Sequence, residues 1–309
     1  MLVSIGEILV DIFKDEKGET IYPGGAPFNL ASNATNYTKE VYFVGAVGND
    51  SNGKLLIKTA KAKGFVKDGI KVIPNKETSR AVVSLDNGER SFRFERDNGA
   101  DYLLSLDDID FSLIKPNDIV HIGSLMLSYK EGVTFFNNLI SKLRTIKGLK
   151  ISFDINYRDD IFSSPSAAKK VFIDALKKAD ILKFSIEELF LLTSKDDVLA
   201  ALRTLLNKNQ VAVVTLGKDG SILYVNDRIH KVETVPLKPV DTTGAGDAFY
   251  SYFLSSLVNN PNFIYNDKLI KQYLFRCNIV GGIATLKKGA IDVAPKENEI
   301  DEFIKRNNL

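Results

Sequence analysis

An acidic residue beside closely spaced glycines is the strongest chemical signal in this chain. The segment Asp241-Thr-Thr-Gly-Ala-Gly-Asp247 is followed by apolar residues at helical spacing, so the glycines open a predicted helix. Glycine lets a ligand approach the backbone, and the free amides at a helix N-terminus favour anions. We therefore predict that the amides of Gly244, Ala245 and Gly246 cradle a phosphoryl group beside a basic carboxylate, Asp247. The alternative is a helix N-cap after a flexible loop, where Asp and Gly are both ordinary.

A second glycine cluster lies near the start of the chain, in Pro23-Gly-Gly-Ala-Pro-Phe-Asn29, and precedes another predicted helix. Backbone amides of such a turn would point at a cavity, and Asn29 is the polar side chain best placed to bind a hydroxylated ligand. The alternative is a plain turn in front of a helix that starts with proline. The residues alone leave both interpretations open.

Composition narrows the chemistry and the partners. The 309 residues include 41 basic and 39 acidic side chains without a block of like charge, so nothing predicts a nucleic-acid or membrane-surface role. Two histidines and one cysteine argue against a disulfide framework, a zinc cluster and a Cys/His dyad, which leaves carboxylates and backbone amides for catalysis. With no basic leader and no apolar stretch of about 18 residues, we expect a cytoplasmic protein.

Strand-like and helix-like segments alternate along the chain. Apolar runs with strand character lie at 2–10, 41–47, 118–123, 150–155, 181–185 and 211–216, and helical patterns lie between them, for example at 132–146 and 167–179. This alternation predicts an α/β fold in which a mostly parallel central sheet is flanked by helices on both faces. In such a fold the ligand crevice lies at the carboxyl ends of the strands.

One region, residues 78–96, interrupts this alternation. Two runs with alternating polarity, 81–85 and 90–96, flank Asp86-Asn-Gly-Glu89, which predicts a β-hairpin. Four of the ten arginines fall in this region, namely Arg80, Arg90, Arg93 and Arg96. One interpretation is a solvated edge strand whose charges prevent pairing, and the other is a lid that brings an arginine to an anionic or hydroxylated ligand.

The motifs together resemble those of the ribokinase-like, PfkB-type, sugar kinases over nearly the whole chain. Both family signatures are present as Gly24-Gly-Ala-Pro-Phe-Asn-Leu-Ala31 and Asp241 to Asp247. The fructokinase pattern is matched by Gly6-Glu-Ile-Leu-Val-Asp11, Phe94-Glu-Arg-Asp-Asn-Gly-Ala-Asp101, Phe153-Asp-Ile-Asn-Tyr-Arg158 and Lys183-Phe-Ser-Ile-Glu-Glu188. The resemblance implies one ribokinase-like domain over 1–309, with a small β-sheet lid built from about 12–22 and 77–100.

The resemblance also implies roles for individual residues on the sugar side. Asp247 would take the proton of the sugar hydroxyl, and the amides of Gly244, Ala245 and Gly246 would form the anion hole. Sugar-binding positions fall on Asp11, Gly25 and Asn29, while Arg96 and Arg158 fall where relatives contact substrate or phosphate.

The same resemblance implies a nucleotide site and two cation sites. ATP would be held by Lys183, Glu188, Thr215, Gly217, Gly220, Gly244, Gly246 and Asn278. Taken alone, Thr215-Leu-Gly-Lys-Asp-Gly220 also fits a hairpin turn. Glu188 occupies the position that organises Mg²⁺ through water. A potassium site would involve Asp241, Thr243, Ala284, Lys287 and Gly289.

We therefore expect ATP-dependent phosphorylation of a sugar primary hydroxyl, D-fructose to fructose 6-phosphate, by a homodimer that pairs through its lids. The alternatives are a 2-keto-3-deoxygluconate kinase or a riboside kinase of the same family, and a noncatalytic ligand-binding homologue.

Other reactive-looking features receive structural interpretations. Gly48-Asn-Asp-Ser-Asn-Gly-Lys-Leu55 nearly spells a P-loop but lacks its final hydroxyl, so we predict the start of a surface helix. We expect His121 in a strand, His230 in a polar turn and Cys277 in a helix, all without a catalytic role.

Overall fold

The computed structural model describes residues 1–15, 18–86 and 89–309. Its described strands form a large sheet in the order β13-β12-β11-β10-β9-β8-β1-β4-β5, in which only β12 and β13 run antiparallel to their neighbours. The prediction of a mostly parallel sheet is thus confirmed. The strands are β1 (Leu2–Ile5), β4 (Val41–Gly48), β5 (Lys67–Ile73), β8 (Ile119–Ile122), β9 (Lys150–Asp154), β10 (Ile181–Ser185), β11 (Val211–Thr215), β12 (Ser221–Val225) and β13 (Arg228–Val232).

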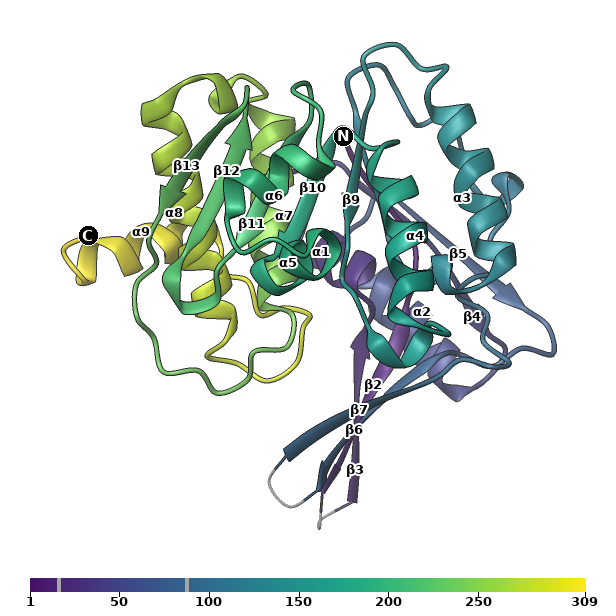
Figure 1. Ribbon diagram of the computed structural model, residues 1–309. Helices are drawn as coiled ribbons and strands as arrows, with labels where there is room; N and C mark the ends of the chain where they lie inside the picture. The colour runs from purple at the N-terminus through teal and green to yellow at the C-terminus, as the bar shows by residue number, and fades with distance from the viewer. Residues whose placement is uncertain (16–17, 87–88) are drawn as a thin grey trace.

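Helices cover both faces of this sheet (Figure 1). Alternate residues of one strand enter separate cores: Ala212 and Val214 of β11 pack on one face, and Val211 and Val213 on the other. The first face carries α3 (Lys130–Leu143), α4 (Pro165–Leu176), α5 (Ile186–Thr193) and α6 (Val198–Leu205). The second carries α1 (Ala26–Ala34), α2 (Ser51–Lys61), α7 (Ala245–Asn259), α8 (Asp267–Ala284) and α9 (Glu297–Arg306).

A second, smaller sheet projects from the body, in the strand order β3-β2-β6-β7 (Figure 1). It consists of β2 (Leu9–Asp15), β3 (Gly18–Gly24), β6 (Arg80–Asp86) and β7 (Glu89–Glu95). The antiparallel pairing of β6 with β7 confirms the predicted hairpin. The predicted turn residues Asn87 and Gly88, and residues 16–17 of the predicted lid segment, lie outside the described residues. We call this four-stranded sheet the lid sheet.

The apolar run at 2–10 is not one strand, as the sequence predicted, but two. It breaks at Gly6, which has a φ of +154°. A Cβ on Gly6 would lie only 2.7 Å from the Pro27 Cγ, so the position excludes a side chain. As a result β1 stays in the large sheet and β2 enters the lid sheet. The short segment between β1 and β2 therefore connects the two sheets at the carboxyl edge of the large sheet.

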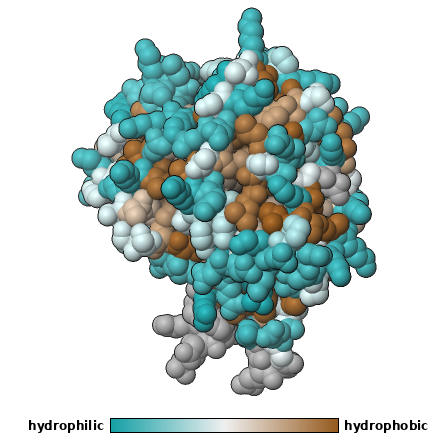
Figure 2. Space-filling model, turned by 90° about the vertical axis from the view of Figure 1, so that its right-hand side faces the viewer, coloured by the Kyte–Doolittle hydropathy of each residue, from teal (hydrophilic) through white to brown (hydrophobic). Residues whose placement is uncertain are grey.

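Three strands were not predicted, at 67–73, 221–225 and 228–232. Two of them, β5 and β13, lie at the edges of the large sheet, where polar and exposed residues such as Arg228 hide the alternation that marks a buried strand. On the face seen in Figure 2, hydrophilic side chains cover the body where the lid sheet leaves it, and apolar side chains gather above them.

The structural interpretations of the reactive-looking residues can also be compared with the fold. The P-loop-like segment starts α2, capped by the Asp50 side chain, which accepts from the Gly53 amide at 2.7 Å. His121 lies buried in β8 and Cys277 lies buried in α8, as predicted. His230, in contrast, lies on strand β13 and not in a turn. Among the described residues, no helix is long and apolar enough to cross a membrane.

Candidate active site

The N-terminus of α7 begins at a glycine in the left-handed region. Gly244 has φ +73°, and a Cβ there would lie 2.6 Å from the Cβ of Ala290, so no side chain fits. The amides of Gly246 and Asp247 belong to the first helical turn, which has no intrahelical acceptors for them. The Ala245 amide donates to the carbonyl of Thr242 at 3.3 Å. The cradle therefore rests mainly on the amides of Gly246, which was predicted, and Asp247, which was not, and anion binding there stays a prediction.

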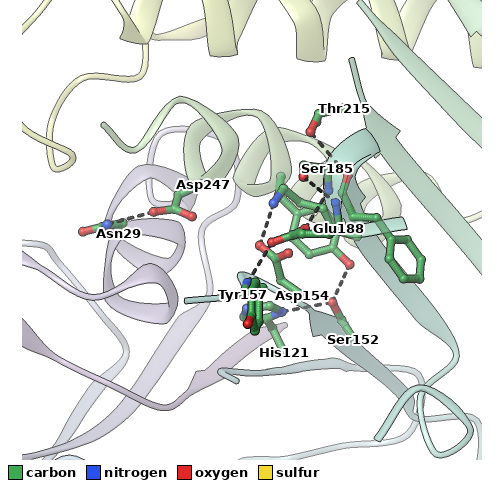
Figure 3. Close-up of polar contacts among 12 residues, drawn as sticks. Asn29, His121, Ser152, Asp154, Tyr157, Ser185, Glu188, Thr215 and Asp247 are labelled. Carbon is green, nitrogen blue, oxygen red and sulfur yellow. Dashed lines mark hydrogen bonds and ion pairs between the residues drawn. The ribbon is translucent and has the colours of Figure 1, made fainter. Parts of the chain in front are cut away.

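Asp247 meets the second glycine turn through Asn29. The Asn29 Nδ2 of α1 donates to Asp247 Oδ2 at 2.8 Å, so the two predicted sites form one (Figure 3). Burial raises the pKa of Asp247 from its usual range, while the Asn29 bond and the Lys183 charge act in the opposite direction. Because the effect of burial is the larger one, the Asp247 carboxylate is a stronger base than a free aspartate, and the Asn29 bond fixes its orientation.

A buried ion pair lies beside the cradle, at the ends of two adjacent strands. Lys183 of β10 binds Asp154 of β9, with 2.7 Å between Nζ and Oδ2, and both side chains are 8% exposed or less. A Cβ on Gly246 would lie 3.5 Å from the Lys183 Nζ. Burial opposes the charge on Lys183, but the carboxylates of Asp154 and Glu188 raise its pKa, so an ammonium borders the anion cradle.

Glu188 holds two loops together at the same edge. Its Oε2 accepts from the Ser185 amide at 2.7 Å and its Oε1 from the Tyr157 amide at 2.8 Å (Figure 3). Burial and the Asp154 charge raise the pKa of Glu188. The Asp154 Oδ1, also buried, has no hydrogen-bond partner among the described residues.

The same carboxylates supply oxygen ligands that suit a hard divalent cation. Because both oxygens of Glu188 already accept backbone hydrogen bonds, contact through water fits better than direct ligation. Within the described ranges, no group of three or more His, Cys, Asp or Glu side chains is spaced to hold a metal ion by itself.

A cavity of about 470 Å³ opens next to the cradle and has the size of a small-molecule site. The predicted nucleotide residues Thr215, Gly217, Gly220 and Asn278 line it. Asn278 uses its Nδ2 to bind the backbone carbonyls of Val232 at 3.0 Å and Glu233 at 3.2 Å, so its amide shapes the wall. The sequence did not single out the wall formed by residues 234–237, which contributes the side chains of Val235, Pro236 and Leu237.

The predicted sugar-binding residues gather on the other side of Asp247. Burial and the Asp247 charge raise the pKa of Asp11 to about 7, and the nearby Arg158 charge lowers it. A Cβ on Gly24 would lie 2.4 Å from Asp11 Oδ2, and one on Gly25 would lie 2.5 Å from the Glu7 carbonyl oxygen. Both glycines are therefore needed to bring this backbone close to the Asp11 carboxylate and the loop after β1.

Comparisons with known proteins show the family of this chain. The sequence profile of the pfkB family carbohydrate kinases matches residues 1–297. The chain belongs to the pfkB family of carbohydrate kinases. It is 33% identical to the probable fructokinase-2 of Arabidopsis thaliana, over 99% of this chain and 96% of that relative.

Solved structures of fructokinases resemble this pfkB-family chain closely. The fructokinase of Vibrio cholerae O395 in fructose-, ADP- and calcium-bound form has a TM-score of 0.88 at 30% identity and covers 98% of both chains. A double mutant of that enzyme, bound to fructose, ADP and potassium, also has a TM-score of 0.88 at 30% identity, with 98% and 97% of the two chains covered. The predicted ribokinase-like family is thus confirmed over the whole length.

The structure also places the predicted cation loop of this pfkB-family chain. Asp241 Oδ1 accepts from the amide and hydroxyl of Thr243 at 3.0 and 2.7 Å, and its Oδ2 accepts from the Gly289 amide at 3.2 Å. Ala284 ends α8, and its carbonyl accepts from the Lys287 amide at 3.3 Å. The five residues thus lie in one turn system around Asp241, and potassium binding there stays a prediction.

Arg96 directly follows β7, at the base of the lid sheet. Its side chain is 2% exposed and pairs with Asp101, 2.6 Å from Nη2 to Oδ2. The predicted picture, in which a closing lid carries Arg96 onto the ligand, does not fit this geometry, because the guanidinium already has buried partners. Arg158, by contrast, is partly buried, and its charge acts on both Asp11 and Asp247.

Sequence reasoning missed two carboxylates of this site. Asp154 ends β9 directly after the buried residues 151–153, and an acidic residue at the carboxyl end of a parallel strand was the available signal. Glu7 is fully buried with both carboxylate oxygens unpartnered among the described residues. Burial raises its pKa to about 8. The signal in the sequence was an acidic residue inside the apolar run at 2–10, which indicates a buried carboxylate.

Proposed function

We propose that this chain transfers the γ-phosphoryl group of ATP to the primary hydroxyl of D-fructose, forming ADP and fructose 6-phosphate. The observation that carries the proposal is the contact of Asp247 with Asn29 directly at the anion cradle of α7, with Lys183 beside it. The relatives support the choice of sugar, because the similar solved structures contain fructose and ADP.

In this mechanism Asn29 orients the Asp247 carboxylate toward the sugar hydroxyl. Asp247 takes the hydroxyl proton as the sugar oxygen forms its bond to the γ-phosphorus, while the bond from that phosphorus to the bridging oxygen of ADP breaks. Negative charge on the transferring group is met by the amides of Gly246 and Asp247 and by the Lys183 ammonium. Most of the catalysis is therefore positioning and electrostatic stabilisation.

Cations complete the proposal. Glu188 and Asp154 would hold Mg²⁺ through water, and the ion supplies neutralisation of phosphate charge. The turn system around Asp241 would hold potassium, an ion present in one of the similar structures. Through the ions that they hold, these side chains would help to orient the phosphates of ATP.

We further propose that the lid sheet covers the sugar and excludes water, since water would otherwise accept the phosphoryl group. Its strand β2 carries Asp11, so the lid sheet and the sugar site share a strand. The proposed homodimer pairs two lid sheets, which light scattering tests directly. We also propose that the protein is located in the cytoplasm.

The alternative substrates have less support from the site. A keto acid such as 2-keto-3-deoxygluconate needs a cation for its carboxylate, and Arg96 is already paired with the buried Asp101. None of the contacts described above favours a riboside over a hexose. A noncatalytic homologue would not need the base, the cradle and the buried lysine that are all in place here.

The experiment is a coupled ADP assay on the wild type and on Asp247→Asn, with fructose, glucose, ribose, adenosine and 2-keto-3-deoxygluconate as acceptors. We expect turnover with fructose, and a fall in kcat of about 10²–10⁴-fold in the variant because the base is lost. Nucleotide binding, measured by calorimetry, should remain. Near-normal kcat in Asp247→Asn would contradict the assignment of Asp247 as the base. Faster turnover with another acceptor of the panel would show that fructose is not the preferred substrate.

A further inference from the structure

A buried ion pair joins the base of the lid sheet to the body. The guanidinium of Arg96 directs Nε and Nη2 at Asp101 Oδ2, at 3.1 and 2.6 Å. Asp101 is fully buried, and the Arg96 side chain is almost so. Because a buried charge is costly without a partner, these two residues depend on each other.

The remaining donors of Arg96 bind the turn that follows β8. Nη1 donates to the Ser128 hydroxyl at 2.8 Å, and Nη2 also donates to the Leu125 carbonyl at 3.1 Å. Both acceptors belong to the 3-10 helix η2 (Leu125–Ser128). The guanidinium thus links the lid sheet to the carboxyl edge of the large sheet, with each of its nitrogens engaged.

Two aromatic rings lie within cation–π distance of the Arg96 guanidinium. Tyr102 and Tyr129 stack with 3.8 Å between their centroids, and the Arg96 Cζ lies 5.8 and 5.2 Å from the two centroids. Such contacts favour a planar guanidinium over an ammonium. The site is therefore built for arginine in one fixed orientation.

Asp101 also binds the other strand of the hairpin. Its Oδ1 accepts a hydrogen bond from the Ser79 hydroxyl. Ser79 directly precedes β6, and Arg96 directly follows β7, so one carboxylate ties both ends of the hairpin. A Cβ on Gly99 would lie 2.4 Å from the Ser79 Oγ, which shows how closely the chain is packed here.

Apolar contacts complete the base of the lid sheet. Leu9 of β2, Ala81 of β6 and Leu125 of η2 form a small buried cluster. Leu9 lies two residues before Asp11 on the same strand, so the orientation of this base sets where Asp11 meets the sugar. The pair of Arg96 and Asp101 is the polar part of the same junction.

We propose that Arg96 and Asp101, with Ser79, form an anchor that positions the lid sheet over the sugar, and that Arg96 does not touch the substrate. This makes Arg96 a positioning residue. The kinetic part of the proposal rests on the proposed function, whereas the structural part does not.

The kinetic test compares Arg96→Lys, Ser79→Ala and Arg96→Lys/Ser79→Ala with the wild type. We expect each single variant to raise the fructose KM at least fivefold, to leave the ATP KM within twofold, and to form more ADP without sugar phosphate, because a displaced lid admits water. The double variant should be no worse than Arg96→Lys, since both changes break one anchor. Arg144→Lys is the matched control: Arg144 pairs with Asp180 at 2.8 Å at the opposite edge of the sheet, and its kinetics should not change.

The outcomes separate the anchor from a direct sugar contact. If Arg96 bound the sugar, Ser79→Ala would leave the fructose KM unchanged, and ADP release without sugar phosphate would not rise. Either result overturns the proposal, as does a double variant whose effects on the fructose KM multiply.

A second measurement does not depend on the substrate. Backbone hydrogen exchange in β6 and β7 of the unliganded protein should be faster in Arg96→Lys and in Ser79→Ala, while α3 and α7 stay protected. Unchanged exchange in both variants would overturn the anchor. If the wild type fails to phosphorylate fructose but exchange changes as expected, the proposed function fails and the anchor stands.

Discussion

The phosphoryl side and the sugar side of the site are built in different ways. On the phosphoryl side, one continuous segment, Gly244 to Asp247, contains the proposed cradle and the proposed base. On the sugar side, Asp11 comes from β2, Asn29 from α1 and Arg158 from the loop after β9. The first side is a local motif, and the second is assembled from separate elements.

This difference shows which interactions tolerate displacement. A helix N-terminus carries its own amides, so the anion cradle forms wherever α7 forms. The sugar side depends on how the lid sheet sits on the large sheet, because Asp11 belongs to the lid sheet. Substitutions should therefore act on ATP chemistry at the first side and on fructose affinity at the second.

On the phosphoryl side, Lys183→Met should have a larger effect than any substitution proposed for the sugar side. Loss of the ammonium beside the cradle should lower kcat by about 10²–10³-fold through lost stabilisation of the phosphoryl charge, with the fructose KM unchanged. Steady-state kinetics with each substrate varied check this split. An altered fructose KM at normal kcat would show that the two sides are not separable.

The same variant leaves Asp154 buried without its partner, which should cost about 3–5 kcal/mol of stability. The double variant Lys183→Met/Asp154→Asn removes that charge and should regain part of the stability in urea unfolding without regaining turnover. Recovery of both together would mean that the lysine acts only through folding.

A smaller effect is expected from Gly24→Ala on the sugar side. The new methyl group would lie 2.4 Å from Asp11 Oδ2 and must displace that carboxylate. We expect the fructose KM to rise about tenfold, a loss of about 1.4 kcal/mol in sugar binding, with an unchanged ATP KM. In an Asp11→Ala background, Gly24→Ala should add little, and full additivity would contradict a role through Asp11.

The smallest effect on the kinetics is expected at Glu7, which lies beneath both sides and whose replacement should act on stability instead. Its pKa is raised by burial from 4.5 to about 8 in the folded protein, so the folded state holds a proton that the unfolded state has lost across this range. Stability from this group is therefore complete below pH 4.5 and is lost as the pH rises toward 8.

Between pH 6 and pH 9 this loss amounts to about 3 kcal/mol, and Glu7→Gln should remove it. Urea unfolding at the two pH values measures the difference, with Glu40→Gln, at an exposed carboxylate, as the control. Equal pH dependence in Glu7→Gln and the wild type would show that Glu7 does not hold its proton.

Much of the phosphoryl side could be predicted from sequence because its signals are local. The glycines before α7 and the capping pattern of Ser185 with Glu188 lie within a few residues of each other. The buried strand β10 was predicted to the residue, since Ile181, Leu182 and Phe184 form an apolar run and four of its five residues are buried. Edge strands such as β13 escaped because half of their side chains face water.

The sequence by itself determined the alternating α/β order and the family, and it pointed to Asp247 as the proposed base, since short-range spacing and backbone chemistry carry that information. Only the tertiary structure decided the partners of the charged groups. It paired Arg96 with Asp101, joined Lys183 to Asp154, and buried Glu7 without a partner among the described residues. The reason is physical: a charge in a low-dielectric interior responds to whatever the packing brings within a few ångströms, and sequence spacing does not record that neighbour.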